Sequence, residues 1–119
     1  MEARTPRPGS PVRGSDSGRP VMAALDLLGR RWTLRILWEL SQGPAGFREL
    51  QRRCERMSSS VLSTRLGELT GARVLTLHGD AYHLTQLGED LVAALSPLNA
   101  WSRRWAEETR TDTAGDCGS

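Results

Sequence analysis

A stretch near the middle of the chain, residues 57–74, places small hydroxyl side chains at helical spacing. Leu62, Leu66 and Leu69 recur at intervals of three and four residues, which predicts a helix with one apolar face. The opposite face carries small residues: Ser60, Ser63, Thr64, Gly67 and Gly71. Such a helix can approach another surface closely, and a DNA major groove is one surface that suits it. The alternative is that serine and glycine simply cover a solvated face.

The start of this helix is also polar. Ser58 is predicted to be its N-cap, because a serine oxygen accepts a hydrogen bond from a backbone N–H of the first turn. The serines after it would leave further N–H groups free at the electropositive end of the helix. Arg65 is expected on the flank of the small-residue face. These groups are suited to contact an anionic surface.

Charge is distributed unevenly along the chain. All 16 basic residues are arginines, but 14 acidic residues leave a formal net charge of only +2. Between residues 48 and 73, however, six arginines accompany three acids. Because a guanidinium can contact two phosphate oxygens at once, this window, which includes Arg52, is predicted to contact a nucleic-acid backbone. The alternative is a solvated face with local ion pairs.

The sequence does not indicate catalytic or metal chemistry. Cys54 and Cys117 have neither disulfide nor metal-ligand spacing, and Cys54 falls on an apolar stripe as a small core residue. His78 and His83 flank a predicted turn without a third ligand nearby. No nucleophile–base pair or phosphate loop is present, so we expect no enzyme activity and no cofactor. We also expect no signal peptide and no membrane span, which favours a cytoplasmic protein with reduced thiols.

Composition divides the chain into three parts. Residues 1–20 are rich in Pro, Gly, Ser and Arg and are predicted to be a disordered arm. Residues 21–108 are expected to form one domain, because a chain of this size has room for one modest core. Residues 109–119 are expected to be a flexible tail.

Three helices are predicted before the serine-rich one, over residues 21–28, 31–42 and 47–57. The first should stop at Gly29, and the second at Gly43 and Pro44. The second has little polar surface and should be the buried centre. A short link with one strand-like residue pair should follow at residues 45–47. The third should lie one tight turn, around Arg56, before the serine-rich helix, which is the arrangement of a helix-turn-helix.

After residue 74 the period changes. Leu75 and Leu77 alternate on one side of Gly79-Asp80, as Tyr82 and Leu84 do on the other, which predicts a two-stranded hairpin.

A last helix is predicted over residues 86–108, with a bend at Pro97. Its apolar stripe is longer than a small domain covers easily, which suggests a second copy of the chain as partner. Trp101 and Trp105 are four residues apart and should stack as interface anchors. The alternative is that the stripe packs back on the first helix.

Four motifs occur in a fixed order over residues 20–108: LGRRWTLRIL, GPAGFREL, LSTRLGEL and HLTQLG. In this combination the chain resembles the HxlR-type bacterial transcription regulators, relatives of the MarR group. The resemblance implies a mainly α fold with a small β-hairpin: a winged helix-turn-helix domain with a long C-terminal dimerisation helix.

The resemblance also implies a homodimer that binds double-stranded DNA at a pseudo-palindromic promoter site. It implies base contacts from Ser59, Ser60, Ser63 and Thr64. It implies DNA-backbone contacts from Arg52, Ser58 and Arg65. It implies that the first and last helices join the protomers through Leu25, Leu91, Leu95, Leu98, Trp101 and Trp105.

The chain departs from the family pattern in three places. Arg19 stands where many members have a sensing cysteine, so thiol sensing is not implied. The predicted wing is cut to Gly79 and Asp80, so its grip on DNA should be poor. Gly67, Gly71 and Arg73 replace the longer polar residues and the closing glycine expected around the end of the serine-rich helix, and the two glycines should each cost about 1 kcal/mol of helix stability.

These departures motivate a second hypothesis, a winged-helix protein-interaction module that has lost DNA readout. A further hypothesis is a small-molecule effector held at the dimer junction by Trp32, Trp38 and Trp101, although tryptophans at helical spacing usually belong to a core.

Overall fold

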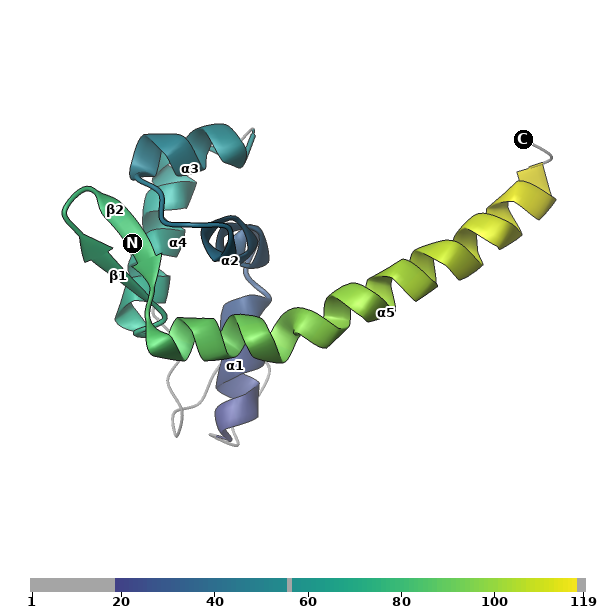
Figure 1. The fold of residues 1–119 in the computed structure, drawn as a ribbon, viewed down its shortest axis with the longest axis horizontal. Helices are drawn as coiled ribbons and strands as arrows, with labels where there is room; N and C mark the ends of the chain where they lie inside the picture. The colour runs from purple at the N-terminus through teal and green to yellow at the C-terminus, as the bar shows by residue number, and fades with distance from the viewer. Residues whose placement is uncertain (1–18, 56, 118–119) are drawn as a thin grey trace.

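The computed structural model describes residues 19–55 and 57–117, with side chains described up to residue 110. In chain order its elements are α1 (Pro20–Leu28), α2 (Thr33–Ser41), α3 (Phe47–Arg53), α4 (Ser59–Gly71), β1 (Leu75–His78), β2 (Ala81–Leu84) and α5 (Gln86–Cys117) (Figure 1). This order confirms the mainly α fold with a small hairpin. Residues 1–18 of the predicted arm, Arg56 in the predicted turn and residues 118–119 of the predicted tail lie outside the described part of the chain.

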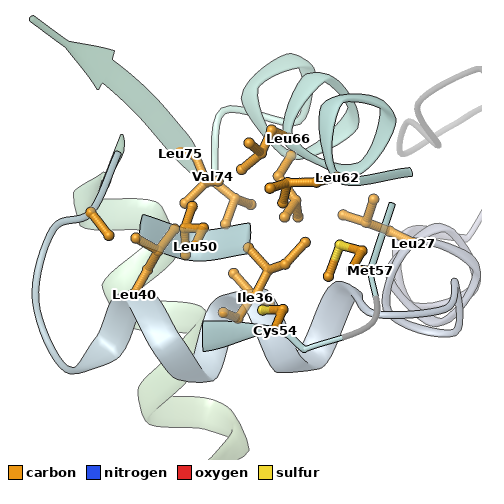
Figure 2. Packing of buried hydrophobic residues seen from close by; sticks show 13 residues of the cluster. Leu27, Ile36, Leu40, Leu50, Cys54, Met57, Leu62, Leu66, Val74 and Leu75 are labelled. Atoms are coloured by element: carbon orange, nitrogen blue, oxygen red, sulfur yellow. The ribbon is translucent and has the colours of Figure 1, made fainter. Parts of the chain in front are cut away.

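The hydrophobic core lies between α2, α3 and α4 (Figure 2). Its buried residues are Leu27, Ile36, Leu37, Leu40, Ala45, Leu50, Cys54, Met57, Leu62, Leu66, Leu69, Val74 and Leu75. Figure 2 shows Leu62 and Leu66 of α4 facing Ile36 of α2. Since fully burying one leucine stabilises a fold by roughly 1.5–3 kcal/mol, these contacts fix which face of α4 points inward. The predicted core roles of Cys54 and of the α4 leucines are confirmed.

The segment between α1 and α2 differs from the prediction. Gly29 caps α1 as expected, but α2 begins at Thr33 because Trp32 adopts a left-handed backbone conformation with φ 77°. The prediction that α2 is the buried centre holds for one face only. Leu34 and Trp38 are exposed, since the core covers only the other side of the helix.

The hairpin forms as predicted, with Leu75 opposite Leu84 and a two-residue connection at Gly79 and Asp80. Gly79 has φ 64°, a conformation that glycine adopts without a steric penalty. A bridge between Ala45 and Tyr82 ties the hairpin to the start of α3, which confirms the strand-like pair expected there. Tyr82 N donates to Ala45 O over 2.8 Å.

Helix α5 begins at a cap and runs further than predicted. Thr85 Oγ1 accepts a hydrogen bond from Gly88 N at 3.0 Å. The predicted end at Glu108 was too early, because the helix continues to Cys117. Figure 1 shows α5 passing the body of the domain, changing direction part of the way along, and then projecting away from it, as expected for a helix that contains Pro97.

Candidate nucleic-acid interface

The start of α4 has the predicted cap. Ser58 Oγ accepts a hydrogen bond from Val61 N at 3.2 Å and lies 3.3 Å from Ser60 Oγ. Ser58 and Ser59 are both exposed. A cap of this kind fixes where the helix begins and satisfies one of the N–H groups of the first turn. The helix start therefore faces solvent in a defined orientation.

One face of α4 is open and the other is buried. Leu62, Leu66 and Leu69 are buried, whereas the small-residue face predicted from the sequence is exposed at Ser60, Ser63, Thr64, Gly67 and Gly71. Within the described part of the chain, the hydroxyls of Ser63 and Thr64 make no hydrogen bond. Their donors and acceptors are available to an external surface, and the exposed helix positions next to them, Ser60 and Gly67, are small residues.

Arg52 of α3 is the most accessible of the predicted backbone-contacting arginines, with 75% of its side chain exposed. It pairs with Glu49 of the same helix, which also accepts from Arg53 Nε at 2.9 Å. The hydrogen bond from Arg53 and the charge of Arg52 lower the pKa of Glu49. The carboxylate is therefore ionised at neutral pH and competes with any phosphate for Arg52.

Arg65 has a different environment. Its side chain is 19% exposed, its Nε donates to Arg31 O at 2.7 Å, and its Nη1 donates to Glu68 Oε1 at 3.1 Å. The structure therefore places Arg65 on the flank of α4, as expected, but with its guanidinium bound to its own chain. Sequence reasoning missed Glu68, which is buried and accepts from both Arg65 and Arg30. The only signal for it was its position between two leucines of the buried face.

The residues predicted to join two protomers fall into two groups. Leu25, Leu98, Trp101 and Trp105 are exposed, while Leu91 packs against the chain's own core and Leu95 is half-buried. Leu91 therefore contacts its own chain in this structure. Trp101 and Trp105 stack as predicted, with their ring centroids 5.6 Å apart.

The hairpin and the cysteine offer little chemistry. His78 and His83 lie edge to face with ring centroids 6.0 Å apart. Among the described residues, no group of three or more His, Cys, Asp or Glu side chains could hold a metal ion. Burial raises the pKa of the Cys54 thiol, which keeps it protonated.

No helix in the described part of the chain is both long and apolar enough to span a bilayer.

Three helices around a core, an uncovered helix after a turn, and a hairpin beside it define a winged helix-turn-helix domain. Residues 27–110 match the model of the HxlR-like helix-turn-helix family, and the chain belongs to that family. It is therefore a helix-turn-helix transcription regulator, in a family of regulators rather than of enzymes.

Individual relatives agree with this assignment. The chain is 30% identical over 92 residues to the HTH-type transcriptional regulator YodB of Bacillus subtilis, covering 71% of this chain and 82% of the relative. It is 30% identical over 96 residues to YvaP of the same organism, an uncharacterised HTH-type transcriptional regulator, covering 75% of this chain and 89% of the relative.

Two solved structures are also similar. The quinone-bound YodB of B. subtilis matches with a TM-score of 0.68 and 31% identity, over 71% of this chain and 96% of that one. A MarR-family regulator of Enterococcus faecalis matches with a TM-score of 0.70 and 26% identity, over 84% of this chain and 97% of that one.

Proposed function

We propose that this regulator binds double-stranded DNA in a sequence-specific way, as a homodimer on a pseudo-palindromic promoter site. The observation that carries the proposal is the uncovered small-residue face of α4, whose hydroxyls at Ser63 and Thr64 are free of partners within the described chain. A helix with that face, held by its leucines on a rigid core, can insert into a major groove and present donors and acceptors to base edges.

We assign each predicted residue a role on this basis. Base contacts come from Ser59, Ser60, Ser63 and Thr64. Ser58 and Arg52 contact the phosphate backbone, Ser58 beside its cap and Arg52 through its exposed guanidinium. Arg65 reaches a phosphate only if its bond to Arg31 O or to Glu68 is exchanged, so its contribution should be smaller than that of Arg52.

Dimer formation fits the exposed apolar side chains of α1 and α5. Leu25, Leu98, Trp101 and Trp105 are exposed on these two helices, and α5 projects from the domain (Figure 1). In a two-fold dimer built on these helices, two copies of α4 would meet major grooves one DNA turn apart, about 34–36 Å. Such spacing corresponds to a pseudo-palindromic site.

A gel-shift titration on genomic fragments, at about 50 and 200 mM salt, tests the proposal. Specific binding that weakens by orders of magnitude between the two conditions is expected, because each protomer would neutralise several phosphates. Arg52→Ala should weaken binding to all fragments about equally. Thr64→Ala should weaken binding mainly to the preferred fragment, so that the difference in binding free energy between preferred and other fragments falls by roughly 1–3 kcal/mol. Binding that is absent, or insensitive to salt, would contradict the proposal.

The second candidate is a protein-interaction module that has lost DNA readout. Two observations favour it: the wing has Asp80 at its two-residue tip, and the guanidinium of Arg65 is bound within the chain. Arg52→Ala with Arg65→Ala separates the candidates, since regulation in cells should survive the double substitution only if DNA contact is not required.

A small-molecule effector is part of the proposal. The three tryptophans expected to hold it have different surroundings: Trp32 packs against the core, whereas Trp38 and Trp101 are exposed. A mainly apolar groove of about 770 Å³ lies instead between α1, the end of α4 and the start of α5, where Leu28, Ala72 and Leu87 contribute to its lining. Isothermal titration calorimetry with candidate metabolites tests for a ligand in this groove.

A further inference from the structure

Four charged side chains connect α1 to the middle of α4. Arg30, in the loop after α1, donates from Nη2 to Asp26 Oδ2 at 3.1 Å and from Nη1 to Glu68 Oε2 at 2.6 Å. Glu68 also accepts a hydrogen bond from Arg65 Nη1. We call Asp26, Arg30, Glu68 and Arg65 the ion-pair chain. It runs from α1 and the loop after it to the helix that we place in the groove.

The ion-pair chain is largely removed from water. Only 3% of the Glu68 side chain is exposed, and Asp26 and Arg30 keep 9% and 11%. Taking such charges out of water is costly, so a buried ion pair often adds little to stability compared with apolar residues of similar size. A carboxylate that bridges two guanidinium groups does, however, accept only a narrow range of geometries. The arrangement is therefore better suited to fixing an orientation than to holding the fold together.

The same loop is attached to α4 at a second point. Arg65 Nε donates to the carbonyl oxygen of Arg31 at 2.7 Å, and the next residue, Trp32, has φ 77°. A bulky residue keeps this sparsely populated conformation only where its surroundings impose it. The loop and the middle of α4 are thus joined by two hydrogen bonds, one from Arg30 to Glu68 and one from Arg65 to the carbonyl oxygen of Arg31.

The other end of the ion-pair chain lies beside the proposed dimer contact. Asp26 follows Leu25, which is exposed on α1 and which we place in the interface between protomers. A shift of α1 on assembly would move Asp26 and Arg30 and, through Glu68, would change the tilt of α4. Thr64 and Ser63 lie about one to one and a half turns before Glu68 on the same helix, so their direction depends on that tilt.

We propose that Glu68 is a positioning residue for DNA readout, which transmits the placement of α1 to the orientation of α4. The part of this inference that concerns DNA rests on the proposed function, whereas the mechanical link between α1 and α4 does not. Glu68→Gln keeps the size of the side chain but removes the charge that holds two guanidinium groups. Glu39→Gln is the matched control, because Glu39 accepts from Arg35 at 2.8 Å within a single helix.

The first measurement uses no DNA. Spin labels at Ala24→Cys on α1 and Thr64→Cys on α4, in a Cys117→Ser background, report the distance distribution between the two helices by double electron–electron resonance. Excess unlabelled protein keeps the signal within one chain. Glu68→Gln should broaden or shift the distribution, while Glu39→Gln should leave it unchanged. A distribution for Glu68→Gln that superimposes on the wild type would overturn the inference.

The second measurement uses a duplex that the wild-type protein enriches from a random-sequence library, and an unselected duplex of equal length. Each variant is titrated at a temperature where circular dichroism shows it fully folded. Glu68→Gln should lose roughly 2- to 30-fold in affinity for the enriched duplex, the range expected when a coupling residue is changed, with a smaller loss on the unselected one. Glu39→Gln should retain both affinities.

Equal losses on both duplexes would overturn the positioning role and leave the proposed function standing. If the wild-type protein enriches no sequence, the proposed function fails, and the distance measurement still decides whether Glu68 links α1 to α4. Should Glu68→Gln not fold, Arg30→Gln breaks the same link from the loop side and takes its place in both measurements.

Discussion

Trp101 and Trp105 stack nearly parallel on α5, with their ring planes 11° apart, while 48% and 57% of the two residues remain exposed. Two stacked indoles left in water form an apolar surface of the kind that a partner covers, and tryptophan is enriched among the residues that dominate interface energetics. The pair lies on the part of the chain proposed to join two protomers.

Replacing both tryptophans, Trp101→Ala with Trp105→Ala, should therefore shift the protein from dimer to monomer. One residue of this kind contributes about 2 kcal/mol or more, which is about 30-fold, so the loss of both should raise the dimer dissociation constant by more than about 30-fold. Sedimentation velocity over a concentration series measures it. Leu77→Ala is the control, because Leu77 is similarly exposed but lies on the hairpin. An unchanged dimer would place the interface elsewhere.

Removing the carboxylate that pairs with Arg52 should strengthen DNA binding. Glu49→Gln removes a charge that competes with phosphate, and the expected gain is that of one exposed ion pair, roughly two- to fivefold. Fluorescence anisotropy on an unselected duplex at low salt measures it, and the gain should vanish in an Arg52→Ala background. A gain that persists there would mean that general charge, rather than the release of Arg52, is responsible.

Two glycines should respond in opposite ways to alanine. At Gly67, in the middle of α4, an added Cβ meets nothing within 4 Å, so Gly67→Ala should stabilise the protein by about 1 kcal/mol. At Gly88, in the first turn of α5, the added Cβ would overlap the carbonyl oxygen of Val74, so Gly88→Ala should destabilise. Urea denaturation compares the two variants with the wild type. Destabilisation by Gly67→Ala would show that the open face of α4 is covered in solution.

Cys54 should be unreactive in the folded protein at neutral pH. In a Cys117→Ser background, alkylation by iodoacetamide should be slow until denaturant is added, because the buried thiol is protonated and inaccessible. Burial raises the pKa of the Cys54 thiol in the folded protein above its value in the unfolded chain. The stability that comes from burying the neutral thiol is therefore fully present below the pKa of the unfolded chain. It is lost as pH rises through the raised value. Cys54→Ala should remove this alkaline loss, and rapid alkylation at pH 7 would contradict the burial.

Local features of the sequence were enough to predict most of the secondary structure. Leu62, Leu66 and Leu69 specified the buried face of α4, and Ser58 marked its start, because helical spacing and capping depend on residues a few positions apart. The turn at Gly79 was predictable for the same reason. The start of α2 was not, since no local pattern marks Trp32 as left-handed, and the carbonyl oxygen of Arg31, just before it, is bound by Arg65, 34 residues further along the chain.

The sequence by itself thus determined the order of the elements, the family, and the face of α4 that stays open. Only the tertiary structure decided which charges are available for binding: Arg52 remains exposed, whereas Arg65 is bound to Arg31 and Glu68. The physical reason is separation along the chain. Arg30 and Glu68 are 38 residues apart, and their pairing depends on how the helices pack, which the spacing of residues within a single helix does not specify.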